Sequence, residues 1–374
     1  MAVSGPGDVE QTLRLVDKAS RLVKQVSLTP RYMLESARSI HRIEALLQGH
    51  MATPAAAPPV PVATPSPGPD AASPLQTYRG YEQEHLRIFQ GFEAPDAGGS
   101  AGFITDFLGV RTRCSSIHDG AGALDGQRLG LPIPGDYHSE TIEWLGLLRS
   151  VLGASQRFVA LELGAGWGPW LVAGATAARR RGIGDIRLTA VEADAGHFES
   201  LHTHLRDNGL DPDTQTLIHA AVGAAEGVAR WPKVVDHANN WGLRPARVDA
   251  QGLRGADVSY LGSLLDDFVE VRIVGVRDIL EREPAWDLVH IDVQGAEAEI
   301  CRAGLDLLQQ RARWIVVGTH SRRLDGEMIS LLHGQGFALE HEKPTRFAYR
   351  ADVAELESMT LADGAQVWRN ITLT

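Results

Sequence analysis

The chain has 374 residues, 44% hydrophobic content and a formal net charge of -11 at pH 7. This size allows about two domains with a substantial core. The acidic balance disfavours nucleic acid as a substrate, because a negative surface repels phosphate backbones.

Two cysteines, Cys114 and Cys301, cannot build a disulfide framework or a zinc cluster. That count fits a reducing, cytoplasmic location. The first residues have no basic segment followed by an apolar run, so we expect no signal peptide. No apolar run reaches the roughly 18 residues that a membrane helix needs, so we expect no membrane span.

Residues 1–50 show apolar positions at helical spacing, interrupted by Pro30. The apolar stripe of such a helix needs a partner. One hypothesis is a coiled coil or helical hairpin that makes a homo-oligomer. The other is a helix that folds back on the main domain. Residues 51–75 are almost wholly Ala and Pro, which predicts a semi-extended linker.

Residues 76–152 mix aromatic residues, turn signals and an amphipathic stretch at 139–151. We expect a helical, loop-rich preface that packs on a catalytic domain at 153–374. In that domain, short apolar runs alternate with helical patterns. The strands are expected at 158–163, 186–193, 215–222, 286–293 and 313–320, and the helices end at 181, 208, 310 and 335.

The last two expected strands, 337–342 and 366–373, have no long helix between them. Apolar strands that alternate with helices predict a parallel sheet covered on both faces. The fold class is therefore α/β: a doubly wound, seven-stranded, Rossmann-like sheet with a terminal antiparallel hairpin. This pattern is typical of class I methyltransferases.

A glycine turn, Gly164-Ala165-Gly166-Trp167-Gly168, follows the first strand, where open α/β sheets bind ligands. Its G-x-G-x-G spacing differs from the dinucleotide pattern G-x-G-x-x-G. It suits a ligand without pyrophosphate, and Glu162 would lie beside a cationic aminoacyl group. We predict contacts of Glu162 and the first four turn residues with S-adenosylmethionine. An ordinary tight turn without a ligand is the alternative.

Glu192 ends the second strand, where a carboxylate can accept hydrogen bonds from both ribose hydroxyls. Ala193 follows it on the cofactor side. Asp194 fits the N-cap of the next helix. At the end of the third strand, Ala221 and its small neighbours leave room for a flat adenine, although simple core filling explains them equally well.

The segment from His290 to Glu297 places polar side chains at the end of an apolar strand. Strand alternation puts His290 and Asp292 on one face. Asp292 lies at the strand end, hence in the cofactor and catalytic site. Gln294 and Glu297 follow and are expected to bind the acceptor. His290 lies deeper, and a core histidine with satisfied hydrogen bonds is the favoured interpretation.

This segment, Asp292-Val293-Gln294-Gly295-Ala296-Glu297, precedes Gly318-Thr319-His320-Ser321 at the next strand end. Together they resemble the signature of the FkbM family of methyltransferases, over roughly residues 161–333. The resemblance implies a class I fold, S-adenosylmethionine, and O-methylation of sugars, polyketides or other secondary metabolites. The chain departs from the family at Glu162, at Trp167 in the turn, and at Ala193, which replaces a usual Pro.

Methyl transfer to an alcohol also needs a base for the hydroxyl proton. His320 is the first candidate, since it ends a strand and titrates near neutral pH. Asp292 is the second, and His138 could close over the site. Asp292, Glu297 and His320 also offer ligands for Mg²⁺, but no fixed ligand spacing supports a metal site, so we predict none.

The stretch 227–262 separates two strands and contains Trp241 among aromatic and amide residues. It either binds a sugar acceptor, with Trp241 in contact, or forms a local mini-core. The leading hypothesis is an S-adenosylmethionine-dependent O-methyltransferase acting on a hydroxyl of a sugar, glycan or related metabolite.

The alternatives are an NAD-dependent oxidoreductase, which the glycine spacing disfavours, and a non-catalytic scaffold that binds S-adenosylmethionine. Methylation of planar nitrogen is disfavoured as well, because the chain lacks an Asn/Asp-Pro-Pro-aromatic segment after the fourth strand.

Overall fold

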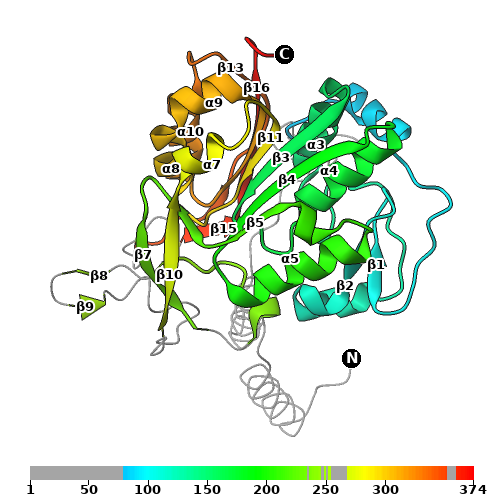
Figure 1. Cartoon of the computed structure of the whole chain (residues 1–374), viewed down its shortest axis with the longest axis horizontal. Coiled ribbons are helices and arrows are strands. Elements are labelled where there is room, and N and C mark those ends of the chain that lie inside the picture. Colours follow the sequence, from blue (N-terminus) through cyan, green and yellow to red (C-terminus); the bar gives the residue numbers. More distant parts are fainter. Residues whose placement is uncertain (1–78, 234–235, 246–247, 250–251, 254–267, 352–358) are drawn as a thin grey trace, which may run out of the picture. The chain divides into compact units, whose positions relative to one another are not determined.

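A computed structural model describes residues 79–233, 236–245, 248–249, 252–253, 268–351 and 359–374 (Figure 1). The helical segment and linker expected in residues 1–75 lie outside these ranges, and so does the homo-oligomer that the segment suggested. The domain limits stay predictions. Within the described ranges, no helix is both long and apolar enough to cross a bilayer.

A seven-stranded sheet forms the centre of the molecule, in the order β13-β16-β12-β11-β3-β4-β5. Strand β16 pairs antiparallel with both of its neighbours, β12 and β13, whereas all the other pairs in the sheet are parallel. This order confirms the predicted fold class, including the antiparallel pair at one edge. Its strands are β3 (Arg157–Leu163), β4 (Asp185–Glu192), β5 (Thr216–His219), β11 (Trp286–Ile291), β12 (Ala312–Thr319), β13 (Phe337–Lys343) and β16 (Gly364–Asn370).

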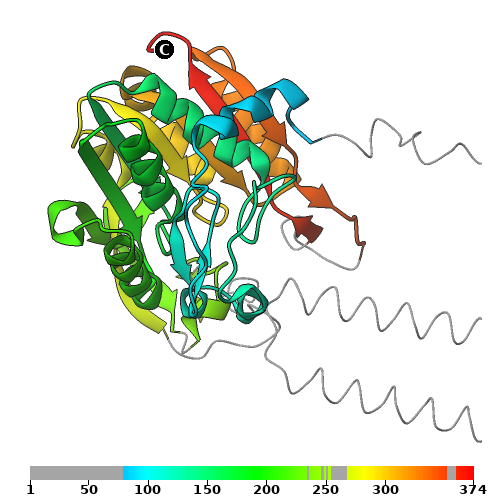
Figure 2. The same ribbon diagram turned by 90° about the vertical axis from the view of Figure 1, so that its right-hand side faces the viewer.

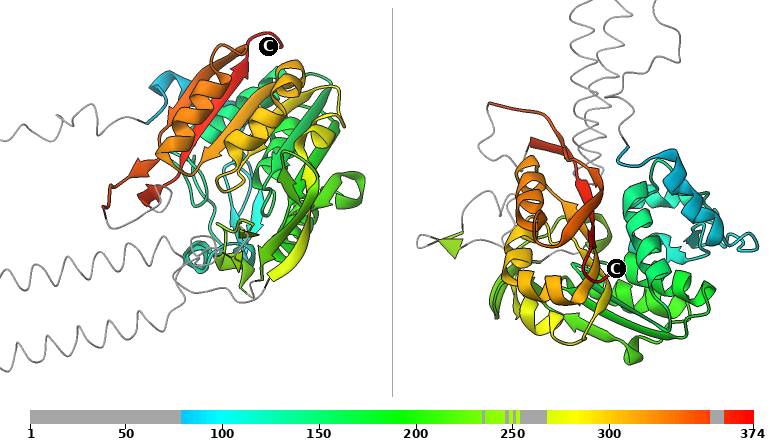
Figure 3. Two further views of the ribbon diagram at one scale, coloured as in Figure 1. Left: turned by 90° about the vertical axis from the view of Figure 1, so that its left-hand side faces the viewer. Right: turned by 90° about the horizontal axis from the view of Figure 1, so that it is seen from above.

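Helices cover both faces of the sheet (Figure 1), and both helical layers are seen from above in Figure 3. Strand β3 shows why, because its residues alternate between the faces. Phe158 and Ala160 join one core, whereas Val159, Leu161 and Leu163 join the other. The first core holds α3 (Thr141–Gly153), α4 (Pro169–Arg180) and α5 (Ala195–Asp207); the second holds α7 (Val276–Leu280), α8 (Glu297–Ala303), α9 (Leu305–Arg311) and α10 (Arg322–Leu332).

The preface packs on the helices of the first layer (Figure 2). Its 3-10 helix η2 (Gln83–Gly91) lies on α3, and its strand β2 (Arg111–Arg113) lies along α5. Phe89, Phe107 and Trp144 stack edge to face, with ring centroids 5.3 and 5.1 Å apart. The preface therefore shares the hydrophobic core of the sheet. Its other elements are β1 (Phe103–Thr105), η3 (Cys114–Ser116) and η4 (Asp119–Leu124).

Two expected elements are divided in the structure. The third strand ends at His219, and the chain then enters β6 (Ala221–Gly223), which pairs with a different sheet. The helix expected to end at 310 breaks at Gly304, where a side chain would press on Leu280. Both expected bounds were wrong, because the spacing of apolar residues shows neither that a strand joins a second sheet nor that a helix is interrupted.

An insertion after β6 builds a small sheet with the order β6-β10-β7, from β7 (Gly227–Pro232) and β10 (Phe268–Gly275). The pattern of the sequence did not predict β10 or α7. The short elements that remain are η5 (Pro212–Thr214), η6 (His237–Asn239), β8 (Val248–Asp249), β9 (Gly252–Leu253), β14 (Arg346–Phe347) and β15 (Thr360–Ala362).

Candidate active site

The glycine turn is a left-handed backbone segment clamped between two strands. Gly164, Gly166 and Gly168 have φ of 74, 55 and 71°, which other residues rarely adopt. The N–H groups of Gly164 and Ala165 both donate to the carbonyl of Val191 at 3.0 Å. A Cβ on Gly164 would overlap the carbonyl oxygen of Asp292. The turn and the end of β11 are therefore in direct contact.

Glu192 holds the turn against the end of β4. Its carboxylate is almost completely buried and accepts hydrogen bonds from the N–H groups of Gly166 and Asp194, both at 2.7 Å. Burial raises the pKa of Glu192 to about 7. A carboxylate has about four lone-pair sites, so two stay available for further donors. Asp194 caps α5 through Gly196 and His197, as the sequence predicted.

Glu162 holds the start of the helix that follows the turn. Its side chain is 1% exposed and accepts a hydrogen bond from the N–H of Leu171, at the start of α4. Burial raises its pKa well above the ordinary value. Its contact with an aminoacyl group stays a prediction.

The side chains of Ala165 and Trp167 lie in two hydrophobic clusters. Ala165 is 1% exposed and belongs to the core of the first helical layer. Trp167 packs against Ile104 and Ile117 of the preface, and its carbonyl contacts His204 Nδ1 at 2.9 Å. The turn directs both side chains into cores, and the contact of these two residues with a cofactor stays a prediction.

Trp241 lies over the glycine turn rather than at an acceptor site. Its ring stacks on His197, with centroids 3.9 Å apart and planes 6° from parallel. Its Cζ3 would be 3.1 Å from a Cβ on Gly166. His237 anchors the same segment through Nδ1, 2.6 Å from Asp194 Oδ1. The contact between His237 and Asp194 could not be predicted from the sequence, because the two residues are far apart in the chain.

His138 does not line an open site. Its side chain is 8% exposed and is enclosed by four aromatic rings with centroids 4.7 to 5.7 Å away. An acceptor would have to displace those rings to reach it. The expected contact with the acceptor is therefore corrected: His138 joins the preface to the turn. The four rings belong to Tyr137, Trp144, Trp167 and Trp170.

Ala193 and Ala221 lie in one small hydrophobic cluster, as neighbours of the β4 and β5 ends. The cluster also contains Trp231, Leu243 and Val271 from the insertion. The β7–β10 pairing fixes the indole, since Trp231 pairs with Val269 in an antiparallel ladder. The insertion thus covers the small residues that were predicted to flank an adenine.

The loop after β11 is held by one buried carboxylate. Glu297 is 0% exposed, and its oxygens accept hydrogen bonds from the N–H groups of Val293 and Gly295 at 3.0 to 3.1 Å. Gln294 has φ 56°, a conformation that costs non-glycine residues energy and concentrates at functional sites. Its side-chain amide donates to Asp292 Oδ1 at 3.1 Å.

Full burial corrects the expectation that Glu297 binds the acceptor. Its Oε1 lies 2.8 Å from His320 Nδ1, while His320 Nε2 lies 3.1 Å from Asp292 Oδ1. The imidazole is thus placed between an enclosed carboxylate and Asp292, whose side chain is 38% exposed. These three side chains were all selected from the sequence, and the structure brings them together.

The charges in this group are strongly coupled. Burial alone would lower the pKa of His320, but Glu297 and Asp292 on either side hold it well above the ordinary value. Burial would raise the pKa of Asp292, yet His320 outweighs it and the pKa is lowered. The two carboxylates therefore favour the protonated form of the imidazole.

The ligand atoms of these three residues lie within 4.8 Å of one another, a spacing that a metal ion could bridge. An imidazolium has no free lone pair for a metal. A metal ion at this position would therefore have to displace the proton from His320.

His290 lies beneath this group and is 3% exposed. Its ring nitrogens are 3.9 Å from Glu162 and Glu143, too far for hydrogen bonds. Neither nitrogen has a hydrogen-bond partner among the described residues. The structure confirms the burial that was expected, but the histidine is not satisfied.

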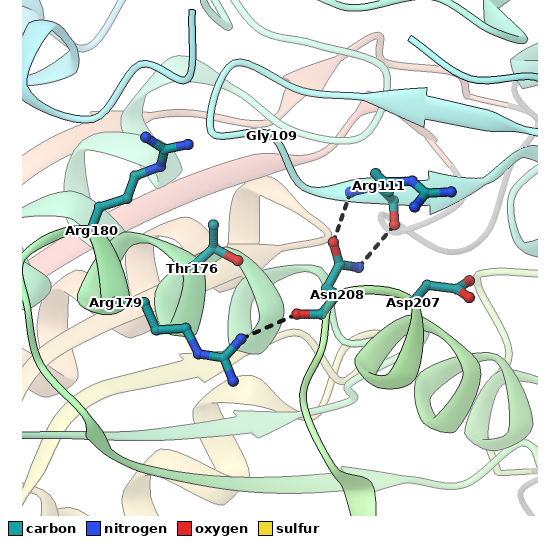
Figure 4. Close-up of a pocket in the computed structure, with 7 residues that line it drawn as sticks. All are labelled: Gly109, Arg111, Thr176, Arg179, Arg180, Asp207 and Asn208. Carbon is teal, nitrogen blue, oxygen red and sulfur yellow. Dashed lines mark hydrogen bonds between the residues drawn. The ribbon is translucent and has the colours of Figure 1, made fainter. Parts of the chain in front are cut away.

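A pocket of about 410 Å³ lies at the far end of α4, remote from the turn at its start (Figure 4). Arg179 donates to the carbonyls of Asn208 and Gly209, and Arg180 donates to those of Leu108 and Glu93. These arginines therefore tie surrounding loops to the helix end.

Comparisons with known proteins agree with this architecture. The family model described as "Methyltransferase FkbM domain" matches residues 171–339. A protein of Jannaschia sp. (strain CCS1) named "Putative methyltransferase" is 33% identical over 286 residues, which are 75% of this chain and 97% of that protein.

Solved structures also match. They include a precorrin-6y C5,15-methyltransferase from Geobacter metallireducens GS-15, with 12% identity and a TM-score of 0.33 over 62% of this chain and 88% of that one. Another is a precorrin 8W decarboxylase from Methanobacterium thermoautotrophicum, with 16% identity and a TM-score of 0.33 over 62% and 91%. Scores this low carry no argument, and the strand order alone supports the fold.

The near-complete coverage of a relative at 33% identity and the family match decide the classification. Methyl transfer replaces the hydride transfer that the sequence left open, and S-adenosylmethionine is in general the donor for such enzymes. This chain belongs to the FkbM family of methyltransferases.

Proposed function

We propose that the protein transfers the methyl group of S-adenosylmethionine to a hydroxyl of a sugar, a glycan or a related metabolite. The observation that carries this proposal is the placement of His320 between Glu297 and Asp292, beside the glycine turn. An alcohol must lose its proton as it is methylated, and His320 in its neutral form is placed to receive it.

The residues present fit the cofactor. Glu192 keeps unused acceptor sites after binding Gly166 and Asp194, and ribose hydroxyls are donors that could use them. The glycine turn follows β3 at the carboxyl edge of the sheet, where open α/β sheets bind their ligands. We assign Glu192 to the ribose, the backbone of Gly164 and Gly166 to the aminoacyl side, and Ala193 and Ala221 to the base.

The sulfonium supplies an activated methyl group, and this chain's residues supply orientation and proton transfer. Asp292 and Gln294 orient the acceptor hydroxyl, and neutral His320 accepts its proton at Nε2. Glu297 stabilises the imidazolium that forms, through Nδ1. The acceptor oxygen forms its bond to the methyl carbon as the carbon–sulfur bond breaks, and that electron pair remains on sulfur. Glu297 is thus a positioning residue.

The group formed by Asp292, Glu297 and His320 also favours a hydroxyl as the acceptor. A hydroxyl is far less acidic than a histidine, so its methylation benefits from a base at the point of attack. Asp292 is partly exposed and its pKa is lowered, so it stays charged and can bind hydroxyl groups of a polyol. A sugar offers several such groups next to one another.

The test is methyl transfer with purified protein and S-adenosylmethionine, using monosaccharides and glycans as acceptors. Mass spectrometry should find a mass gain of one methylene on an oxygen of the acceptor. A second arm compares the glycans of cells with and without the protein. Methylation found only on nitrogen or carbon would refute the proposal, and so would full activity in His320→Ala.

A further inference from the structure

The indole of Trp231 carries a polar group that the fold leaves unused. The side chain is 8% exposed, and its Nε1 has no hydrogen-bond partner among the described residues. Buried polar groups are nearly always paired, and an unpaired one costs stability. Trp286 and Trp368 differ, since their Nε1 atoms donate to Leu280 and Gln366, whereas the Nε1 of Trp167 in the glycine turn is also unpaired.

The position of this indole is set by the insertion. In β7 the side chains of Ala229 and Trp231 are buried while the intervening Arg230 is exposed, so the two face inward. Pairing with β10, which also pairs with β6, fixes β7 near the end of the main sheet. Trp231 therefore packs with Ala193 and Ala221.

Those two alanines flank the space assigned to the base of the cofactor. Ala193 directly follows Glu192, and Ala221 begins β6, which parallels β10. The indole N–H is a donor only, and a purine edge offers ring nitrogens that only accept. A donor with no protein partner beside an expected base matches that chemistry.

We propose that the indole N–H of Trp231 donates a hydrogen bond to a ring nitrogen of the adenine of S-adenosylmethionine, and so selects the base. This inference rests on the cofactor site proposed above. It assigns a binding role to the insertion, which lies outside the glycine turn and the strand ends.

The experiment measures dissociation constants by calorimetry for S-adenosylhomocysteine and for three analogues in which N1, N3 or N7 of the base is replaced by C–H. The proteins are the full chain, Trp231→Phe, and Trp314→Phe as a matched control. Trp314 is 6% exposed and lies near the start of β12, away from the site. Circular dichroism checks the folding of each variant.

Trp231→Phe should bind S-adenosylhomocysteine about 3- to 10-fold more weakly than the wild type. One of the three analogues should bind the wild type and Trp314→Phe more weakly than S-adenosylhomocysteine does, by the same factor. Trp231→Phe should bind that analogue and S-adenosylhomocysteine equally well. Unchanged binding by Trp231→Phe would overturn the inference. So would an equal loss for every analogue in both proteins.

A second measurement covers the case in which Trp231→Phe does not fold. In wild-type protein labelled with ¹⁵N-tryptophan, one indole N–H resonance should move downfield with S-adenosylhomocysteine and not with the discriminating analogue. Identical spectra for the two ligands would contradict the proposal. If neither the wild type nor Trp314→Phe binds S-adenosylhomocysteine, the proposed cofactor site itself fails, and the inference fails with it.

Discussion

The glycine turn and the loop after β11 meet at one edge of the sheet, yet they are held by different forces. At the turn, backbone groups bond to Val191 and Glu192, and three glycines allow left-handed angles. At the loop, the imidazole of His320 lies between the carboxylates of Asp292 and Glu297. The turn is therefore sensitive to added volume, whereas the loop is sensitive to charge and pH.

The difference also separates two tasks. A cofactor that is bound in every catalytic cycle needs a preorganised surface, which backbone hydrogen bonds supply. Proton transfer needs a group whose charge can change, and a coupled imidazole with carboxylates supplies that. Five predictions would break or sharpen this contrast.

The largest effect is expected from added volume at the turn. Gly164→Ala would force a Cβ onto the carbonyl of Asp292 at φ 74°, and should destabilise the protein by at least about 3 kcal/mol and abolish cofactor binding. The matched control is Gly182→Ala, at φ 78° with no neighbour within 4 Å, which should cost about 1–2 kcal/mol. Thermal unfolding measures both, and equal losses would contradict the clamp.

Removal of the base comes next. His320→Ala should lower kcat by about 10²- to 10⁴-fold, while the dissociation constant of S-adenosylhomocysteine stays near that of the wild type. Glu297→Gln should give a smaller loss and an altered pH profile, as a positioning residue does. His333→Ala, at an exposed residue after α10, serves as the control. A kcat for His320→Ala equal to that of the control would remove the histidine from the mechanism.

The activity should depend moderately on pH and increase as the pH rises. Catalysis needs neutral His320, whose pKa is raised by Glu297 and Asp292 after burial has acted to lower it. Activity should therefore increase with pH, with a midpoint above the ordinary histidine value. Asp292→Asn removes one negative charge and should move that midpoint to lower pH. Glu327→Gln, on the surface of α10, should not move it.

The same shift links His320 to stability. Its folded pKa exceeds its unfolded pKa, so its contribution is present below the unfolded value and is lost as pH rises through the folded one. A pH series of unfolding free energies measures this, and Asp292→Asn should flatten the curve. If Asp292→Asn raised the midpoint of the activity profile, or left the curve of unfolding free energy against pH unchanged, the interaction between Asp292 and His320 would be contradicted.

The smallest effect is expected from metal removal. Treatment with EDTA should leave kcat unchanged, because the proposed base is His320 itself and the proton transfer needs no ion. The activity assay before and after dialysis checks this. Loss of activity that Mg²⁺ restores would instead assign the group to a metal.

The order of strands and helices could be predicted from the sequence, because apolar periodicity reflects which faces are buried. The same holds for Asp194 as a helix cap and for Asp292 and His320 at strand ends, since these positions follow from local chain geometry. The segment 292–297 also indicated the FkbM family from the sequence alone.

Only the tertiary structure decided which way the side chains point. Glu162 and Glu297 are both acidic residues next to the site, and each turned out to be buried and bonded to nearby backbone N–H groups. Trp231 packs with Ala193 and Ala221, and Trp241 lies against Gly166, through an insertion whose strand pairing is non-local. Local sequence determines which elements form, whereas long-range packing determines what each polar atom can contact, and the chemistry depends on those contacts.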